Sequence, residues 1–487
     1  MKNEKKNFDV PFIIFIGILL VALVITAIVM YAEGKDLPVN EPSAEPSSLP
    51  TNIPSPTSSP MPSESETPVE PTFTYSMPRT ASVSLSDFLA WDLTIGGSET
   101  DVVSDVTALD KLYLFGTTSS TDYDMSANDG SDLFVAVIEE DRLVDVITFG
   151  TEKDDVCLFA KPCYGAFGTT FVVFSQSAED TVDFYLLPTK TLSPLMKTLS
   201  FSGKVSFVKA VVLPDGALLA VNEKGVLRLI RVYADGSTDE IELKKEAFAK
   251  DMQVLGNNAM ILYSLSGKED LTGVLTVDLT GKNGETSNIF SDKSRIPLSI
   301  TPDENGYIIP YKRVVDAKTV FGVMHLSRDL LIDFDHAVSG ADYDEINVFC
   351  DIGATKLKGY HIFCTKKTAT GYKTTYENIC THGDLNDFSG ELLENVLPTK
   401  YYNSKNGVTI LGNVLKEGKS NFYMAVFSNN FAKQEEYVFG GDGNDVLHFG
   451  VTTKDGDFLL IGNTTSHSGD ISVSFGKADV LILSYGK

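Results

Sequence analysis

The sequence predicts an all-β fold, a β-propeller of eight blades, behind a single transmembrane helix and a disordered stalk. Three observations support this prediction. A stretch of 21 residues near the N-terminus carries no charge, a segment rich in proline, serine and threonine follows it, and the rest of the 487-residue chain consists of short apolar runs separated by turn residues. These runs are too short for helices and have a period of two where they alternate, which is typical of strands.

The uncharged stretch, residues 12–32 from Phe12 to Ala32, is predicted to cross a membrane as one helix. At a rise of about 1.5 Å per residue it would be about 32 Å long, close to the thickness of a bilayer core. Three lysines lie in residues 1–11, and positive residues favour the cytoplasmic side, so this end is expected inside the cell and the rest outside. A cleaved signal peptide is the alternative, but the stretch is longer than a signal core and lacks a small-x-small cleavage site.

Residues 33–80 are predicted to form a disordered stalk. Between Pro38 and Thr80 the chain holds 11 of its 20 prolines and 15 serines or threonines. Such a composition cannot bury enough apolar surface to offset the entropy lost on ordering. The stalk would therefore hold the folded part, residues 81–487, away from a cell membrane that the chain crosses once.

The charge of the chain excludes one class of partner. The chain has 66 acids against 40 bases, a net charge of −26, and residues 81–487 alone carry −22. A polyanion does not neutralise phosphate groups, so a nucleic-acid partner is excluded.

A repeated motif predicts the propeller. In each copy a Gly turn precedes an Asp, and an apolar strand, a polar loop and a second apolar strand follow. The copies are Gly96-Gly97 with Asp101, Gly440-Gly441 with Asp445 and, more weakly, Gly150 with Asp155. Units of about 50 residues with four strands each are typical of propeller blades. We place eight units at residues 98–150, 151–203, 204–244, 245–292, 293–340, 341–395, 396–441 and 442–487.

The two ends of the folded part are expected to meet in one blade. The last repeat ends at Tyr485 after three strands, and residues 88–97 resemble the missing fourth strand. Pairing of this N-terminal strand with the last blade would close the ring and leave no open edge. The repeats between residues 204 and 430 diverge from the others, so seven blades remain an alternative.

The end repeats resemble the tandem Gly-Gly-x-x-x-Asp propeller repeats of bacterial surface and secreted proteins, the SBBP-like repeat family. The loops at residues 120–132 and 466–479 look like the Ser/Thr-Asp-Gly-Asp loop of that family. The resemblance implies a propeller outside the cell. It implies no activity, because the motif residues of the family shape turns and do no chemistry.

Two segments have the spacing of a calcium site. Residues 440–448, from Gly440 to His448, match the nonapeptide of parallel β-rolls, and residues 122–130 have alternating oxygen side chains. The first has no tandem copy, and the second lacks the central Gly and the final Glu of an ion-binding loop. The favoured interpretation is that Asp101, Asp155 and Asp445 accept hydrogen bonds from turn N–H groups, so no metal site is predicted.

The five cysteines lack a CxxC pair, and their odd number leaves at least one thiol unpaired or paired between molecules. Cys350, Cys364 and Cys380 fall on three successive predicted strands, so one cross-strand disulfide is an alternative to buried thiols, which are favoured. The other two are Cys157 and Cys163.

No pattern of catalytic or cofactor-binding residues emerges. The six histidines form no HxH or HExxH pattern, there is no GxSxG, and the two SxxK matches, Ser206 to Lys209 and Ser474 to Lys477, lie in strand contexts. Four tyrosines are candidates for stacking on a sugar, although strand cores explain most tyrosines here; they are Tyr360, Tyr372, Tyr401 and Tyr402.

The favoured function is a non-catalytic binding or scaffold module that meets a surface protein or glycan at one face of the ring. The first alternative is an extracytoplasmic glycan hydrolase or lyase, which would need carboxylates and a His or Tyr converging in a pocket. The second is a sensor with its output elsewhere, since residues 1–11 are too few to signal unaided.

Overall fold

The computed structural model describes residues 78–486, except for residues 84–87, 129, 166–167, 242, 244–246, 266–267, 281–284, 290–294, 341, 352–358, 405–406, 429–430 and 455. The predicted membrane helix and all but the last three residues of the predicted stalk lie outside the described residues. Among the residues that are described, no helix is long and apolar enough to span a bilayer.

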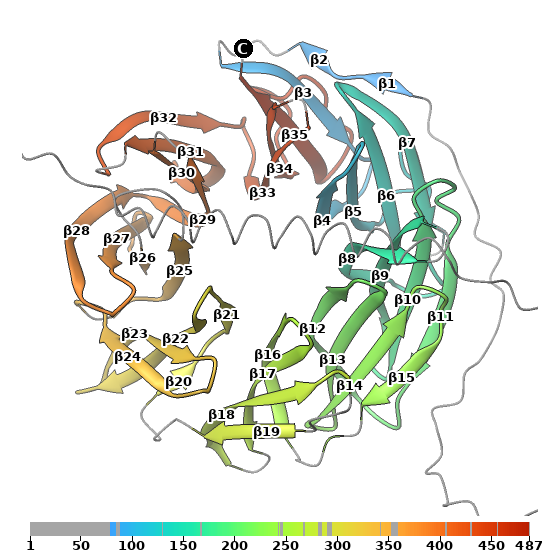
Figure 1. The fold of residues 1–487 in the computed structure, drawn as a ribbon. Coiled ribbons are helices and arrows are strands. Elements are labelled where there is room, and N and C mark those ends of the chain that lie inside the picture. Colours follow the sequence, from blue (N-terminus) through green and yellow to red (C-terminus); the bar gives the residue numbers. More distant parts are fainter. Residues whose placement is uncertain are drawn as a thin grey trace, which may run out of the picture. The chain divides into compact units, whose positions relative to one another are not determined.

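Eight antiparallel sheets stand side by side in a ring, which confirms the predicted propeller of eight blades (Figure 1). Each predicted repeat contains one sheet. Blades 1 to 4, with their strands in order from the axis outward, are β4 (Asp101–Ala108), β5 (Leu112–Thr118), β6 (Asp132–Glu139) and β7 (Arg142–Phe149); β8 (Val156–Gly165), β9 (Gly168–Ala178), β10 (Thr181–Pro188) and β11 (Leu195–Ser200); β12 (Val205–Leu213), β13 (Gly216–Glu223), β14 (Val226–Tyr233) and β15 (Thr238–Ile241); and β16 (Ala247–Leu255), β17 (Asn258–Leu265), β18 (Lys268–Asp278) and β19 (Glu285–Ile289).

Blades 5 to 8 continue the ring. Blade 5 begins with two short pieces, and blade 8 takes its outer strand from the N-terminal side of the chain. Their strands are β20 (Ile296–Pro297), β21 (Thr301–Pro302), β22 (Gly306–Val315), β23 (Lys318–Ser327) and β24 (Ile332–Ala337); β25 (Glu345–Asp351), β26 (Gly359–Lys367), β27 (Tyr372–Ile379) and β28 (Leu385–Glu394); β29 (Val396–Ser404), β30 (Gly407–Lys416), β31 (Lys419–Ser428) and β32 (Lys433–Phe439); and β33 (Asp445–Thr452), β34 (Phe458–Thr464), β35 (Asp479–Tyr485) and β3 (Leu89–Ile95).

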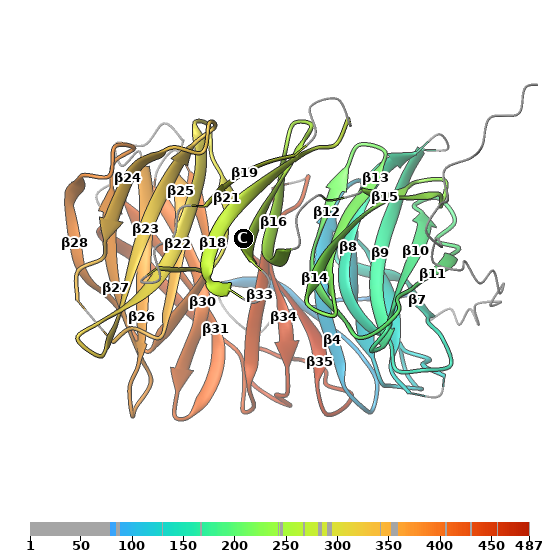
Figure 2. The ribbon, with the colours of Figure 1, turned by 90° about the horizontal axis from the view of Figure 1, so that it is seen from below.

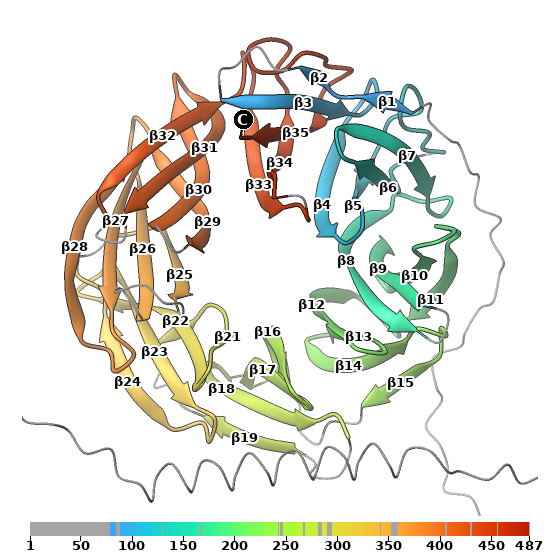
Figure 3. The ribbon, with the colours of Figure 1, turned by 45° about the horizontal axis from the view of Figure 1, so that its top comes forward.

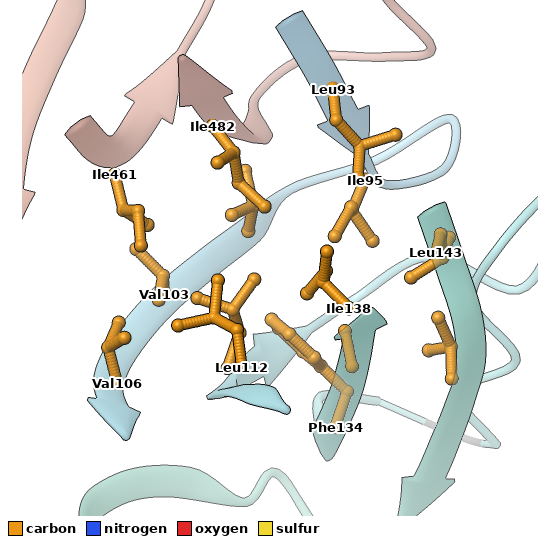
Figure 4. Packing of buried hydrophobic residues seen from close by; sticks show 14 of the residues in the cluster. Leu93, Ile95, Val103, Val106, Leu112, Phe134, Ile138, Leu143, Ile461 and Ile482 are labelled. Atoms are coloured by element: carbon orange, nitrogen blue, oxygen red, sulfur yellow. The ribbon is translucent and has the colours of Figure 1, made fainter. Parts of the chain in front are cut away.

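The N-terminal strand closes the ring as predicted (Figure 3). β3 pairs with β35, with Trp91 opposite Ser484 and Asp92 opposite Leu483. Apolar side chains of blade 8 then pack on those of blade 1: Leu93 and Ile482 lie in one buried cluster with Val103 and Phe134 (Figure 4). The first and last strands of the propeller are therefore held by both hydrogen bonds and a shared core.

The middle strands of the blades are buried on both faces, and for this reason they are continuous apolar runs in the sequence. Each blade packs on a neighbour at both faces, so a middle strand such as β6 is buried from Asp132 to Ile138. Strands buried on both faces do not alternate. The outermost strand β24 instead exposes Ile332 and Asp333.

The innermost strands share a one-residue register shift in six blades. The shifts lie between Val103 and Asp105, Cys157 and Phe159, Phe207 and Lys209, Ala249 and Asp251, Pro398 and Lys400, and Leu447 and Phe449. A bulge of this kind re-aims the side chain that follows it. Two carboxylates thereby reach the next blade: Asp105 accepts from the N–H of Ala160 at 3.1 Å, and Asp251 from that of Ile300 at 3.0 Å.

A short strap crosses the seam between blades 1 and 8. β1 (Arg79–Thr80) pairs with β7 of blade 1, and β2 (Ser82–Val83) pairs with β3 of blade 8. The guanidinium of Arg79 donates to Asp124 and to the Thr94 carbonyl and lies 4.8 Å from the centre of the Phe475 ring. Arg79 is one of the last residues of the segment predicted to be a disordered stalk. The proline-rich composition of that segment gave no sign that this residue joins blades 1 and 8.

Replacement of Arg79 tests the role of the strap. Arg79→Ala would leave Asp124, whose side chain is only 7% exposed, without its ion pair. We expect a loss of roughly 1–3 kcal/mol in stability, seen as a lower thermal unfolding midpoint. Arg142→Ala, at an exposed position of the neighbouring strand β7, is the control and should leave the midpoint unchanged. Equal midpoints for the two variants would contradict a role of Arg79 at the seam.

Candidate functional site

The ring has two faces with different turns (Figure 2). Because the strands of each blade are antiparallel, the connection between blades and the loop between the second and third strands lie at one face. We call it the Gly-Gly face, since Gly96 and Gly97 lie there between β3 and β4. The turns that join first to second and third to fourth strands lie at the opposite face, which we call the groove face.

At the Gly-Gly face the repeated Asp organises its turn. Asp101 is fully buried and accepts hydrogen bonds from the Gly97 N–H at 2.7 Å and from the hydroxyls of Thr118 and Ser120 at 2.5 and 2.9 Å. A side chain at Gly96 would place its Cβ 2.1 Å from Oδ1 of Asp479, so the buried Asp479 carboxyl group would have to move.

The other two copies have the same arrangement, so the predicted role of these aspartates in the turns is confirmed. Asp155 accepts from the Thr151 N–H at 2.6 Å, and Asp445 accepts from the Gly441 N–H at 2.8 Å. The hydroxyls of Thr464 and Ser466 donate to Asp445. In the first copy, the hydroxyls of Thr118 and Ser120 donate to Asp101 in the same way. Within the calcium-like nonapeptide, the carboxylate of Asp445 therefore faces hydrogen-bond donors of the protein.

The second calcium-like loop is likewise engaged with the protein. Asp122 accepts from the Ser98 N–H at 2.7 Å, and Asp124 bonds Arg79 and the Gly96 N–H. Asp129, which belongs to the same loop, lies outside the described residues. Across the described part of the chain, no group of three His, Cys, Asp or Glu side chains is arranged to hold a metal ion.

Burial raises the pKa of Asp101 to about 6, against hydrogen bonds from Thr118, Gly97 and Ser120 that favour the charged form. A carboxyl group whose pKa is higher in the folded than in the unfolded state takes up a proton on folding. Its contribution therefore favours the folded state as the pH falls through the interval between the two pKa values.

The variant Asp101→Asn tests this titration. Between about pH 7.5 and about pH 5 the wild-type protein should gain stability from Asp101, by about 1.4 kcal/mol, and the variant should lack this gain. The measurement is the difference in thermal midpoint between the two pH values. Asp235→Asn is the control, because hydrogen bonds from Ser237 lower the pKa of that exposed carboxyl and keep it ionised in this interval. A wild-type pH response in the Asp101 variant would contradict the assignment.

The groove face is hollowed between blades 1 and 2. The cavity has a volume of about 610 Å³ and is called groove 1–2. Blade 1 contributes the β4–β5 turn, residues 109–111, and Asp145 of β7, while blade 2 contributes Thr169 and the β10–β11 turn, residues 189–192. The lining thus combines carboxylates, lysines and threonine hydroxyls with a few apolar side chains.

A second cavity lies at the equivalent place between blades 4 and 5. This groove 4–5 has a volume of about 710 Å³ and is lined by the β16–β17 turn of blade 4 and by Tyr307 and Arg328 of blade 5. Asp278 at its wall accepts from the Thr280 N–H at 2.8 Å and hydroxyl at 2.7 Å. The two grooves therefore repeat one inter-blade position of the propeller.

Between blades 5 and 6 the same position is filled. Phe334 of β24 lies 5.5 Å from the His325 ring and 5.7 Å from the Tyr360 ring, measured between ring centres. Gly383 of the β27–β28 turn covers Phe334, since a Cβ at Gly383 would come within 2.7 Å of the ring. Aromatic side chains here occupy the space that is open in the two grooves.

The filled position holds an acid, histidine and tyrosine set that an enzyme could use. Nε2 of His325 lies 3.2 Å from Oδ2 of Asp303, and Nδ1 lies 2.8 Å from Oδ2 of Asp333. The Tyr360 hydroxyl donates to Asp303. However, the side chains of His325 and Asp303 are each 3% exposed and Tyr360 is 2% exposed, so a substrate has no access to them.

The electrostatics of this set indicate a structural role. Burial would raise the pKa of Asp303, but hydrogen bonds from His325, Tyr360 and two backbone N–H groups hold it well below its ordinary value. Burial would lower the pKa of His325, but Asp303 and Asp333 outweigh it and raise that pKa. The contact between Asp303 and His325 therefore favours the charged form of both side chains between the blades.

The other residues that the sequence analysis singled out lie apart from the grooves. Tyr401 stacks on Phe349 between blades 6 and 7, and the Tyr402 hydroxyl donates to the Gly450 carbonyl at 2.6 Å. Lys209 pairs with Asp251, so it is not directed at Ser206. Three of the tyrosines proposed for sugar stacking, Tyr360, Tyr401 and Tyr402, thus make contacts within the ring.

None of the five cysteines, all of which the structure describes, is in a disulfide, and Cys157, Cys163 and Cys364 are buried. Cys350 lies opposite Tyr360 and Cys364 lies opposite Thr375, so the ladder pairs neither of them with another cysteine. Burial raises the pKa of Cys157 to about 12, which leaves this thiol unreactive at neutral pH.

Comparison with known proteins identifies no family. No protein-family model matches the sequence, and no curated protein matches it. Solved structures similar to the chain include Sqt1 from Chaetomium thermophilum, with 11% identity, a TM-score of 0.48 and coverage of 84% of this chain and 100% of that chain. Dihydro-heme d1 dehydrogenase NirN has 12% identity, a TM-score of 0.47 and coverage of 84% and 81%. The WD40 domain of SCAP from fission yeast has 9% identity, a TM-score of 0.43 and coverage of 81% and 94%. At these values the similarities carry no information about function.

Proposed function

We propose that this propeller is a non-catalytic binding module of the cell surface, and that its ligand, a surface protein or glycan, meets the groove face. The observation that carries this proposal is the repetition of an open, polar cavity at equivalent inter-blade positions, groove 1–2 and groove 4–5. Ligand sites are concave and contain a small number of placed polar groups. Two such sites on one face suit a ligand with repeated units or a broad contact surface.

Binding is favoured over catalysis by the location of the ionisable groups. In the set with a histidine and a tyrosine, His325, Asp303 and Tyr360 are buried and hydrogen-bonded to one another. One observation favours the alternative of a glycan hydrolase: groove 1–2 has two carboxylates, Asp110 and Asp145, and such enzymes use a carboxylate pair. Groove 4–5 has the same place in the fold but its Asp278 is held by Thr280, which suits a repeated binding site better than a repeated catalytic one.

The proposal includes a place in the cell. Residues 12–32 would anchor the chain in the cell membrane with residues 1–11 in the cytoplasm, and residues 33–80 would carry the ring, residues 81–487, outside. The uncharged stretch, the lysines before it and the proline-rich composition support this topology. The turn geometry at Gly97, Thr151 and Gly441 supports membership of the Gly-Gly-x-x-x-Asp propeller repeats of bacterial surface proteins.

Protease treatment of intact cells that produce the protein tests the topology. We expect cleavage within residues 38–77, because extended and solvated chain is the preferred substrate of proteases, and release of the intact ring into the medium. A version without residues 12–32 should not sediment with membranes. Protection of the ring until the cells are lysed would contradict the proposed location.

A screen that separates binding from turnover tests the function. The purified protein is applied to an array of surface glycans and of candidate surface proteins, and bound glycans are recovered and analysed by mass spectrometry. We expect retention without new products, because His325, Asp303 and Tyr360 are buried between the blades. Appearance of shortened or unsaturated glycans would assign the protein to the hydrolases or lyases.

A further inference from the structure

Groove 4–5 contains a tyrosine whose hydroxyl bonds none of the described residues. Tyr307 of β22 lines the groove and is 4% exposed. Its ring belongs to a buried cluster of blades 4 and 5 that also contains Met260 and Leu326. The hydroxyl has no hydrogen-bond partner in the described part of the chain, and its oxygen keeps surface that water can reach. A buried tyrosine usually bonds a partner through its hydroxyl, so this one is available to a ligand.

A guanidinium group faces the same groove. Arg328 directly follows β23, lines the groove and donates a hydrogen bond of 2.8 Å to the Glu304 carbonyl. It forms no ion pair with any acid that the structure describes. Leu330 fixes the turn that carries it, because its side chain lies in the buried cluster with Tyr307. Burial raises the pKa of Tyr307, and the positive charge of Arg328 opposes this rise, so the hydroxyl lies in the field of the guanidinium.

The filled position between blades 5 and 6 shows what a tyrosine at this place binds. Tyr307 and Tyr360 each follow the glycine that opens the second strand of their blade, so the two tyrosines are equivalent. The Tyr360 hydroxyl donates to the carboxylate of Asp303, in the turn between the first and second strands of blade 5. Nε2 of His325 lies 3.2 Å from the same carboxylate. The acid there is held by a tyrosine hydroxyl and a basic side chain.

Blade 4 lacks the corresponding acid. Its turn between the first and second strands consists of Gly256 and Asn257, so no carboxylate stands where blade 5 has Asp303. The carboxylate that does line the groove, Asp278, is 7% exposed and accepts two hydrogen bonds from Thr280. Groove 4–5 thus has the tyrosine and a basic side chain, and it has open space in place of the acid that they would hold.

We propose that groove 4–5 binds the carboxylate of an acidic sugar unit through the Tyr307 hydroxyl and the Arg328 guanidinium. The ligand carboxylate would take the place that Asp303 has between blades 5 and 6. The proposal rests on the proposed function and names the ligand class of one of its two grooves. Charge-assisted hydrogen bonds to a carboxylate are short and strong, and the planar guanidinium matches the geometry of a carboxylate.

The rest of the lining favours a sugar as the carrier of the carboxylate. The groove has a volume of about 710 Å³, which leaves room for more than a carboxylate group. Asn257 and Asn258 line it and are exposed. Their amide groups both donate and accept hydrogen bonds, as the hydroxyl groups of a sugar do.

The negative charge of the ring does not prevent this binding. Glu304 and Asp329 lie close to Arg328 in the sequence or in space, but they are exposed and are not part of the lining. Exposed charges farther away than about 10 Å are largely screened at ~0.1 M salt. The accessible charge inside the groove is therefore that of Arg328.

Calorimetric titration of the full chain in nanodiscs of zwitterionic lipid tests the proposal with three probes: a trimer of galacturonic acid, the neutral sugar cellotriose, and the acidic peptide triglutamate. We expect the galacturonate trimer to bind more tightly than the other two. Tyr307→Phe removes only the hydroxyl, and Arg328→Gln removes the charge and keeps much of the length. Each variant should bind the galacturonate trimer roughly tenfold more weakly, or worse.

A second tyrosine and arginine pair provides the matched controls. In blade 3 the guanidinium of Arg231 lies 4.8 Å from the centre of the Tyr233 ring, and these two side chains bond Asp215 and Asp239. Tyr233→Phe and Arg231→Gln should bind the galacturonate trimer as the wild-type protein does. The thermal midpoint of Tyr307→Phe should equal that of the wild-type protein, because the removed hydroxyl bonds no described residue.

The other outcomes decide against one proposal or the other. Equal binding of the galacturonate trimer by the wild-type protein, Tyr307→Phe and Arg328→Gln would overturn the site in groove 4–5 and leave the proposed binding function standing. Binding of cellotriose or triglutamate as tightly as the galacturonate trimer, or of none of the probes, would overturn the assigned ligand class. Conversion of the galacturonate trimer into shorter or unsaturated products would overturn the non-catalytic function itself.

Discussion

Every blade of this molecule depends on cover for both of its faces, and the pairing of β3 with β35 provides that cover for the first and the last blade at once. A single four-stranded sheet with two apolar faces is not stable in water, so the blades must form a closed ring. Three kinds of contact stabilise this one seam. They are the backbone pairing of Trp91 and Asp92 with β35, the buried cluster that contains Leu93 and Ile482, and the contacts of Arg79.

Beyond the seam, neighbouring blades are joined by hydrogen bonds that the bulged inner strands and the second strands supply. Asn222 exchanges two hydrogen bonds of 2.9 Å with Ala249 of the next blade, and Asn413 exchanges two with Leu447, of 3.2 and 2.7 Å. These contacts satisfy backbone groups of the innermost strand next to its register shift. At the groove face, the side chains that lie between neighbouring blades differ from blade to blade: two of these positions are open cavities, and one is filled by aromatic side chains.

Much of the architecture could be predicted from the sequence, because the closing strand and the Gly-Gly turns are local patterns. The blade count was less secure, since the middle repeats lack that motif. They share another signal: Gly216, Gly306, Gly359 and Gly407 open the second strand of blades 3, 5, 6 and 7. A Cβ at any of these four positions would come within about 2 Å of a carbonyl oxygen on the third strand.

The candidate site could not be predicted in the same way. Asp145 and Thr169 are 24 positions apart on different blades, and nothing in either segment indicates that they face one cavity. The set around Asp303 combines residues from four strands and turns of two blades, so it too becomes visible only after the blades are placed. Arg79 was missed for a different reason, because its neighbours have the composition of a linker.

The closing pair also fixes the order of events when the protein is made. The strand β3 leaves the ribosome before β4 to β32, the strands of the first seven blades, whereas its partner β35 leaves after them. Until β35 has been made, the early strand must wait with one edge unsatisfied, a state that is prone to self-association. Chaperones that bind extended strands would therefore act longest on residues 89–95. In a chain released before β35 is made, the edge of β3 that pairs with β35 would remain exposed.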